Sequence, residues 1–357
     1  MSRKVVLLGP LPPPYGGVSV YLSALREHLA PDGVRTWALF GGEGERDART
    51  TFVKHRRLGL VPVVLREGRG ARVLDATHFH FEYPNKILLP LWLACKRVLG
   101  FEWHKHVHDG TLPTRYPGFT RAQRRLFRLA VRHVDEFVVV SEELRRWLLE
   151  EVGAEQKITV VPSLLPIPRR HLERALTASI EDRLTPFLRA ARRVCSVGVF
   201  TESYGFAHAA AAVERLRAET GEEIGLVLLD GTFARDEGYR DEVLRGREWV
   251  TVLENVPSPD VYQIMRRSDA FVRAVSHEGY GISRVEATWC GLPVVATAAG
   301  ETRGMLIYEF GDVEGLARQL RRALFDSRAR DVAGWAALYR GEAEENLRAL
   351  RRALLTD

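Results

Sequence analysis

Cysteine and long apolar runs are both scarce in this chain of 357 residues. The cysteines are odd in number and lie about a hundred residues apart, at Cys95, Cys195 and Cys290. This spacing argues against a disulfide framework and a zinc site, and it is typical of a reducing cytosol. No run of about 18 apolar residues occurs, so no segment is expected to span a bilayer. The short apolar run 5–8 stops at Gly9-Pro10 and predicts a first strand, not a signal peptide. We therefore expect a cytoplasmic protein.

Low-complexity tracts and internal repeats at solenoid spacing are also absent. A hydrophobic content of 46% is enough for real cores, and the length suits two domains of roughly 150 residues each. No Gly-x-Gly-x-x-Gly pattern follows the first strand, which argues against a nicotinamide-dependent dehydrogenase.

The positive charge is placed unevenly along the chain. Residues 1–163 hold 25 Lys/Arg and 17 Asp/Glu, a net charge of +8, which leaves −2 for the remainder of a chain whose total is +6. A basic N-terminal half suggests an anionic partner such as phospholipid headgroups, an acidic acceptor or nucleic acid. An arginine-rich composition without functional meaning is the alternative.

Predicted strands and helices alternate in two series. The first runs from the strand 5–8, through strands at 76–81 and 105–108 and an arginine-rich helix at 120–134, to a strand at 158–161. The second begins with a strand at 194–199 and ends with helices at 313–325 and 333–355. Such alternation favours two α/β domains with parallel sheets and helices on both faces. We expect a domain at 1–165, a linker at 166–190 rich in proline and polar residues, a domain at 191–330, and a helix within 331–357 that crosses back to the first domain.

The most informative stretch is 276–287, which reads SHEGYGISRVEA. Two glutamates, Glu278 and Glu286, are separated by seven residues, and a glycine-bearing turn follows the first. Gly279 and Gly281 allow the backbone to approach a ligand closely. The N–H groups from about Tyr280 to Ser283 should form a helix N-terminus, which attracts a diphosphate. Glu278 can then accept hydrogen bonds from sugar hydroxyls, and Glu286 from ribose hydroxyls.

This stretch, with the run CGLPVVAT at 290–297, resembles the donor-site motif of family-four retaining glycosyltransferases of the GT-B type (glycosyl transferases group 1). The resemblance implies two Rossmann-like doubly wound domains facing a central cleft, and transfer from a nucleotide diphosphate sugar with retention. It assigns Glu278 to the donor sugar and Glu286 to the ribose. A solvated glutamate pair beside an ordinary turn is the alternative.

The N-terminal half resembles the same family at two places. Gly16-Gly17 lies between the first strand and the first helix, where adjacent glycines let a ligand approach the backbone. His108 ends a strand and matches the histidine that touches the donor sugar from the acceptor domain; a core histidine is the alternative. His78 and His80 resemble a strand motif that is usually structural. No acid or cysteine completes a ligand set around these histidines, so no metal is expected.

Two family cations are missing. Val199 stands where the family has an arginine and Tyr204 where it has a lysine, and these residues neutralise the donor diphosphate. Desolvated phosphates need charge-assisted donors. Arg273 lies at a strand end five residues before Glu278, Arg303 lies in the loop after the strand that begins at Pro293, and both are the expected replacements. An exposed salt bridge with Glu301 or Glu278 is the alternative for each, and Arg284 should lie on the outer side of its helix. The alternative is a catalytically silent sugar-nucleotide-binding partner or regulatory subunit.

The expected site therefore has two catalytic residues, His108 and Glu278, and a larger donor-binding set. That set comprises Gly16, Gly17, Arg273, Gly279, Tyr280, Gly281, Ile282, Glu286 and Arg303. No cofactor is expected apart from the nucleotide diphosphate sugar, which is a substrate. The acceptor, whether glycan, lipid-linked or a natural product, is not indicated.

Peripheral association with the anionic inner membrane surface is a further expectation, and nucleic acid is not. Its candidates are the helix 120–134, with five arginines, and the arginines at 56, 57, 66, 69 and 72. A solvated helix face is the alternative.

Overall fold

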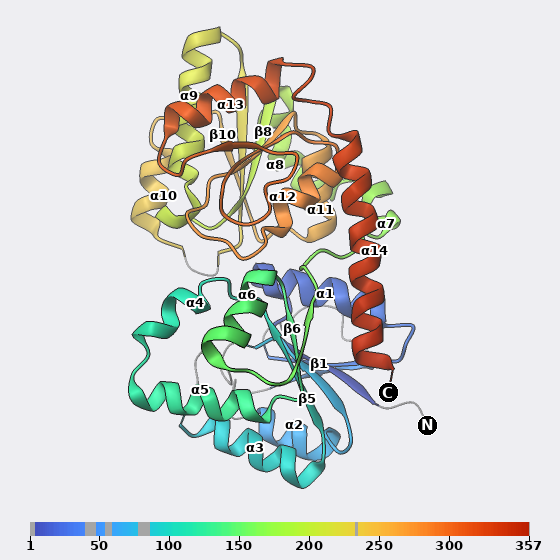
Figure 1. The fold of residues 1–357 in the computed structure, drawn as a ribbon. Helices are drawn as coiled ribbons and strands as arrows, with labels where there is room; N and C mark the ends of the chain where they lie inside the picture. Colours follow the sequence, from blue (N-terminus) through green and yellow to red (C-terminus); the bar gives the residue numbers. More distant parts are fainter. Residues whose placement is uncertain (1–3, 40–47, 54–58, 78–85, 233–234, 357) are drawn as a thin grey trace. The chain divides into compact units, whose positions relative to one another are not determined.

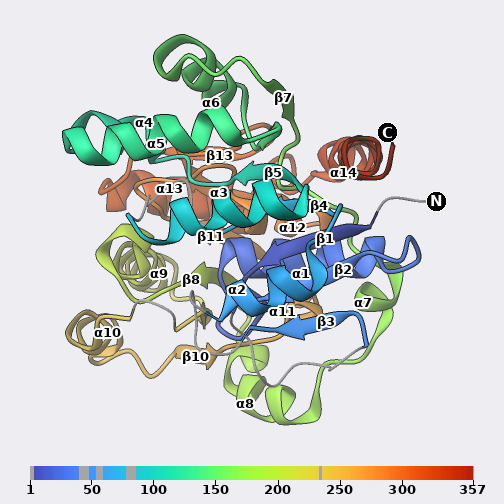
Figure 2. The same ribbon diagram turned by 90° about the horizontal axis from the view of Figure 1, so that it is seen from below.

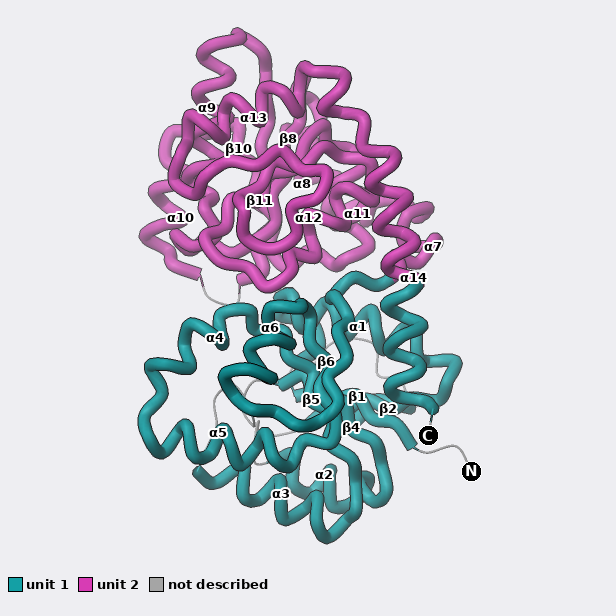
Figure 3. The backbone as a smooth tube through the Cα atoms, viewed as in Figure 1, with its two compact units in different colours: residues 1–165, 345–357 teal, residues 166–344 magenta. Residues whose placement is uncertain are grey.

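A computed structural model describes residues 4–39, 48–53, 59–77, 86–232 and 235–356. The chain forms two compact units (Figure 3). Unit 1 comprises residues 1–165 and 345–357, and unit 2 comprises residues 166–344.

Unit 1 is built on a parallel sheet of seven strands, in the order β3-β2-β1-β4-β5-β6-β7. The strands are β1 (Val5–Gly9), β2 (Arg35–Ala38), β3 (Thr50–Phe52), β4 (Arg72–Asp75), β5 (Glu102–Val107), β6 (Glu136–Val139) and β7 (Lys157–Val160). All residues of β1, β4 and β6 are buried, as expected for a parallel sheet covered on both faces.

The helices of unit 1 follow its strands in the chain (Figures 1 and 2). They are α1 (Gly17–Leu29), α2 (Leu60–Glu67), α3 (Leu88–Leu99), α4 (Leu112–Arg115), a 3-10 turn (Tyr116–Gly118), α5 (Arg121–His133), α6 (Glu142–Trp147) and a π-helical turn (Leu148–Val152). Thr120 caps α5 because its Oγ1 accepts a hydrogen bond from the Gln123 N–H, and the Thr120 N–H donates to Gln123 Oε1, so the sequence itself sets the start of this helix.

The strand predicted at 76–81 is wrong at its start, because the fourth strand of the sheet is Arg72–Asp75. Residues 78–81 of that prediction lie outside the described residues.

Unit 2 has a parallel sheet of six strands, in the order β10-β9-β8-β11-β12-β13. The strands are β8 (Arg192–Gly198), β9 (Ile224–Asp230), β10 (Val250–Glu254), β11 (Ala270–Arg273), β12 (Val294–Thr297) and β13 (Leu306–Tyr308). The helices are α7 (Arg169–Glu173), α8 (Ala178–Arg189), a 3-10 turn (Glu202–Tyr204), α9 (Phe206–Thr220), α10 (Glu237–Leu244), α11 (Ser258–Arg266), α12 (Ile282–Trp289), α13 (Val313–Phe325) and α14 (Ala333–Leu355).

The stretch 166–190, predicted as a linker, carries the helices α7 and α8 and belongs to unit 2. Thr177, before α8, donates through its N–H to the buried carboxylate of Asp260 over 2.9 Å. Pro186 lies inside α8 without ending it.

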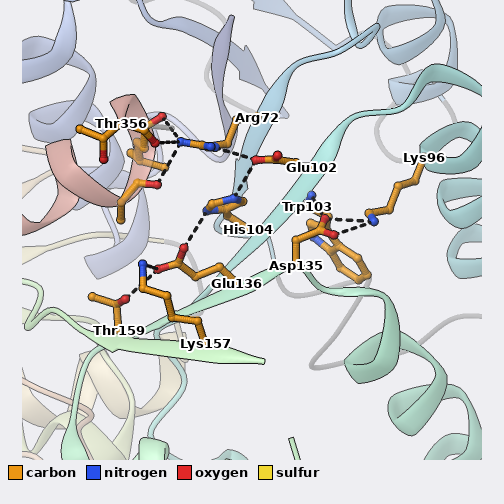
Figure 4. A network of polar contacts seen from close by, with 12 residues as sticks. Arg72, Lys96, Glu102, Trp103, His104, Asp135, Glu136, Lys157, Thr159 and Thr356 are labelled. Atoms are coloured by element: carbon orange, nitrogen blue, oxygen red, sulfur yellow. Dashed lines mark hydrogen bonds and ion pairs between the residues drawn. The ribbon is translucent and has the colours of Figure 1, made fainter. Parts of the chain in front are cut away.

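Helix α14 begins in unit 2, and its last turns belong to unit 1. Arg72 of β4 holds its C-terminal end (Figure 4). The Arg72 Nη1 donates to the carbonyl oxygens of Leu354 (3.0 Å) and Thr356 (2.7 Å), and its Nε donates to Glu102 Oε2 (2.7 Å). A guanidinium at this position satisfies carbonyls that a helix end leaves without partners.

The same network continues across the sheet of unit 1 (Figure 4). His104 lies 3.4 Å from Glu102 and 3.9 Å from Glu136, and Glu136 also accepts from Lys157 (2.9 Å) and Thr159 (2.7 Å). Burial lowers the pKa of His104, although both glutamates act to raise it. The network therefore ties β4 to β7 and to the last turn of the chain.

Candidate functional site

The site of unit 2 lies at the carboxyl edge of its sheet, where the strand order reverses between β8 and β11. Ligands of open α/β sheets bind at such a switch point. The loop after β11 carries Glu278, and the loop after β8 carries Tyr204. The loop after β12 contacts the loop after β11, because the Glu301 N–H donates to the Tyr280 carbonyl over 2.9 Å.

Glu278 is clamped between two arginines. Arg273, at the end of β11, donates from Nε to Glu278 Oε2 over 3.1 Å and from Nη2 to Oε1. Arg284, in α12, donates from Nη2 to Oε2 over 2.8 Å. The side chains of Arg273, Glu278 and Arg284 are 9%, 12% and 0% exposed. We call these three residues the Glu278 triad.

The charges of the triad fix the protonation state of its carboxylate. Burial alone would raise the pKa of Glu278, but the guanidinium groups of Arg273 and Arg284 offset this and hold it below its usual range. Glu278 is therefore an ionised, immobilised acceptor at neutral pH.

Gly281 lets the triad pack against the first turn of α12. Its φ of +86° is a conformation that favours glycine, and a Cβ there would lie 2.7 Å from both Arg284 Nε and Glu278 Oε2. No side chain caps α12, and the Ser283 hydroxyl has no partner among the described residues. The N–H groups at Ile282 and Ser283 are thus available to an anion.

Glu286 lies one turn further along α12 and is only partly exposed. Its Oε1 accepts from the Tyr262 hydroxyl over 2.8 Å. Burial raises the pKa of Glu286 to about 7, and the hydrogen bond from Tyr262 opposes this only in part. Glu278 and Glu286 therefore differ in environment: the first is held ionised, and the second titrates near neutrality.

Arg303 is not brought to Glu278. Its guanidinium pairs with Glu301 (2.7 Å) and with Glu342 of α14 (2.7 Å). The Tyr280 hydroxyl is buried near this group without a partner among the described residues, and burial raises the pKa of Tyr280 far above its usual range. Arg303 thus forms salt bridges with Glu301 and Glu342, and its expected role at the diphosphate stays a prediction.

The expectation that Arg284 lies on the outer side of its helix is wrong. Its side chain is fully buried and contacts Glu278, and its Nη1 donates to the carbonyl oxygens of Thr297 (3.2 Å) and Glu301 (2.9 Å). Nearby, the Arg273 guanidinium lies 5.1 Å from the centre of the Tyr204 ring, and Val199 is fully buried. The loop after β8 itself supplies no cation at these two positions.

The predicted residues of unit 1 lie at the carboxyl ends of β1 and β5. Gly16 precedes the first residue of α1, and its N–H donates to Ser19 Oγ over 2.9 Å. A Cβ on Gly17 would meet no atom of the described residues within 4 Å, so the backbone is open on that side.

His108 follows β5. Its Nδ1 lies 3.1 Å from Ser163 Oγ, and its ring packs with centroid distances of 4.0 Å to His106 and 4.9 Å to Tyr21. Burial lowers the pKa of His106 to about 3, so this neighbour is neutral and puts no charge against His108. The contact with Ser163 restrains the orientation of the His108 ring.

The described residues contain no group of three or more His, Cys, Asp or Glu that could hold a metal ion. His78 and His80 lie outside them. Among the described residues, no helix is both long enough and apolar enough to cross a bilayer.

Of the two basic segments, the helix α5 presents its arginines to solvent. Arg121, Arg125, Arg128 and Arg132 are exposed, and none of them pairs with an acidic side chain among the described residues. In the second segment, Arg66 pairs with Glu67 (2.6 Å), Arg69 is exposed and Arg72 is buried. Arg56 and Arg57 lie outside the described residues.

Sequence reasoning missed Arg284, Tyr262 and Ser163 as parts of the site. The small residues Ala287 and Thr288, about one turn after Arg284, could have indicated room for a buried long side chain on that face of α12. Tyr262 and Ser163 contact their partners from distant elements, and no local pattern points to them.

Two family models match the chain: Glycosyltransferase Family 4 over residues 15–165, and Glycosyl transferases group 1 over residues 189–337. A 2-deoxystreptamine glucosyltransferase from Streptomyces kanamyceticus is 28% identical over 247 residues, which are 64% of this chain and 63% of that protein. O-antigen chain mannosyltransferase B from Escherichia coli is 32% identical over 108 residues, 27% of this chain and 28% of that protein. The matches thus span less than two thirds of these relatives.

The whole fold has a counterpart among solved structures. Anabaena HepE, solved in complex with UDP and glucose, superposes with a TM-score of 0.73 at 16% identity, covering 99% of this chain and 100% of that chain. The fold agrees with the two parallel α/β sheets described above. The chain therefore belongs to the glycosyl transferases group 1 family and has the GT-B fold.

Proposed function

We propose that this protein transfers a sugar from a nucleotide diphosphate sugar to an acceptor, with retention at the anomeric carbon. One observation carries the proposal: an ionised carboxylate, Glu278, an uncapped helix N-terminus and a second carboxylate, Glu286, follow one another along a single loop and helix at the switch point of the sheet. The relative HepE was solved with UDP and glucose, which supports a nucleotide-sugar donor.

Each residue has a role that follows from its chemistry. The N–H groups at Ile282 and Ser283 bind the diphosphate, Glu286 accepts hydrogen bonds from the ribose, and Glu278 accepts from hydroxyls of the sugar. His108, by its resemblance to the family histidine, contacts the donor sugar from unit 1. Catalysis then comes from positioning the donor and from stabilising the charge on the leaving phosphate, without a dedicated nucleophile.

A two-stage experiment tests this. Thermal-shift measurements with UDP-, GDP-, ADP-, CMP- and TDP-linked sugars identify the donor, since a ligand at 100 times its Kd stabilises the fold by about 2.7 kcal/mol. Nucleoside diphosphate release then measures turnover, and proton NMR of the product gives its anomeric configuration. An inverted anomer would refute retention, and binding without any release would refute transfer.

A catalytically silent sugar-nucleotide-binding subunit is the second candidate. It is favoured by the buried Val199 and by Tyr204, which leave the loop after β8 without a cation at these positions. Donor binding with neither hydrolysis nor transfer over a panel of acceptors would establish it.

The acceptor is proposed to lie at, or be delivered from, an anionic membrane surface. Four arginines lie along α5 at positions 121, 125, 128 and 132, a spacing that places them on one face, and Leu129 of the same helix is 36% exposed. Helix α3 lies beside α5 (Figures 1 and 2), and its Val98 is 78% exposed. Arginines that have no acidic partner among the described residues, together with neighbouring apolar side chains, fit anionic headgroups.

A further inference from the structure

The Glu278 triad is buried and carries more positive than negative charge. Two guanidinium groups face one carboxylate, so the triad carries a net charge of +1. Burying a charge without a partner is costly, and the cost falls when a counter-ion is supplied.

The neighbouring ion pairs do not remove this excess for a bound ligand. Arg303, Glu301 and Glu342 form an outer cluster of net charge −1. Arg303 is 44% exposed and Glu342 is 30% exposed, against 0% for Arg284. Glu301 itself is only 11% exposed, but Arg303 neutralises it through two hydrogen bonds of 3.0 and 2.7 Å. The negative charge left over lies on Glu342, which is more exposed than the triad and is therefore screened more strongly by solvent.

The triad also has an unused donor that is aimed at the helix N-terminus. Arg284 Nε is buried and has no hydrogen-bond partner among the described residues. It lies 2.7 Å from the position a Cβ would take on Gly281, the residue before the first turn of α12. The positive end of α12 and the excess charge of the triad thus coincide, which suits an anion of more than one charge.

We propose that the Glu278 triad supplies the counter-charge for the donor's diphosphate, with Arg284 as the positioning residue that makes the triad net cationic. This rests on the proposed function and deepens it. Arg284 acts by immobilising Glu278 and by setting the sign of the charge beneath α12. The role assigned to Arg303 in the sequence analysis passes to Arg284.

The test varies the net charge of the triad and measures binding of nucleotides that lack a sugar. Arg284→Met lowers the net charge to zero, Glu278→Gln raises it to +2, and the double variant returns it to +1. Calorimetry gives the affinities of the matched pairs UDP/UMP, GDP/GMP and ADP/AMP for each protein. The quantity compared is the diphosphate-to-monophosphate affinity ratio for the base that the wild-type protein binds.

We expect this ratio to rise about tenfold in Glu278→Gln, to fall about tenfold in Arg284→Met, and to return to the wild-type value in the double variant. Arg284→Lys keeps the charge and should retain most of the ratio. Arg322→Met, at an exposed arginine of α13, is the matched control and should change it less than about threefold.

A purely structural role for Arg284 predicts a different result. The affinity ratio of the double variant would then be no higher than that of Arg284→Met. Equal ratios in all four proteins of the cycle would overturn the proposal. If the wild-type protein binds none of the nucleotides, the proposed function itself fails, and the proposal falls with it. Circular dichroism checks folding, and should Arg284→Met not fold, Glu278→Gln against wild type still decides the outcome.

Discussion

Glu286 should lower the stability of the folded protein at alkaline pH, although its carboxylate is proposed to bind the ribose of the donor. Burial raises the pKa of its carboxyl from the ordinary value of 4.5 to about 7 in the folded chain. Between these two values the folded state binds more protons than the unfolded state, so stability falls as pH rises through this window. Glu286→Gln removes the titrating group and keeps the shape.

The difference between 4.5 and about 7 corresponds to about 3 kcal/mol once the carboxylate is fully ionised. We therefore expect Glu286→Gln to be up to about 3 kcal/mol more stable than wild type at pH 8, and to differ little near pH 4.5. Urea unfolding followed by circular dichroism at both pH values measures this. Glu248→Gln, at an exposed residue of the same unit, is the control and should stay within about 0.5 kcal/mol at each pH.

The same variant should bind nucleoside diphosphate more weakly at pH 8, by about 1.5–3 kcal/mol, because a charge-assisted hydrogen bond to the ribose is lost. A stability difference that does not depend on pH would refute the titration of Glu286 near neutrality. Unchanged nucleotide affinity would refute its contact with the ribose.

Three further outcomes are expected. Glu278→Ala should abolish turnover without weakening the binding of free nucleoside diphosphate, as kinetics and calorimetry would measure, and a large loss of affinity would contradict the assignment to the sugar. Gly281→Ala should destabilise unit 2 by about 1–3 kcal/mol in thermal unfolding, because its Cβ would meet Arg284 and Glu278 at 2.7 Å in a left-handed backbone conformation; wild-type stability would contradict this packing. Arg125→Glu/Arg128→Glu should lose co-sedimentation with phosphatidylserine vesicles at low salt, whereas equal binding of variant and wild type would exclude α5 as the contact surface.

Local patterns predicted the fold well where they were strong. The helices at 313–325 and 333–355 agree with α13 and α14, and the doubly wound architecture in two halves is confirmed. The short strands β2, β3 and β13 were not predicted, because three or four residues give too little periodicity.

The candidate site was predictable in its loop and helix but not in its charges. The spacing of Glu278 and Glu286 with the glycines between them is a local signal, and the structure places that loop at the switch point of the sheet. Which arginine faces Glu278 depends on packing: Arg284 is buried because Gly281 and the loop after β12 leave it room, whereas Arg303 meets Glu342 from a helix 39 residues later. A contact between residues so far apart in the sequence leaves no local pattern from which it could be predicted.

The return of the last helix to unit 1 has a consequence for dissecting the protein. The carbonyl oxygens that Arg72 binds come from residues synthesised only after the whole of unit 2. A single cut of the chain therefore cannot release both units intact. A fragment ending at residue 165 lacks residues 345–357, and a C-terminal deletion removes part of unit 1. Joining residue 165 to residue 345 through a short flexible segment is the rational design for an isolated unit 1, and in translation this unit becomes complete last.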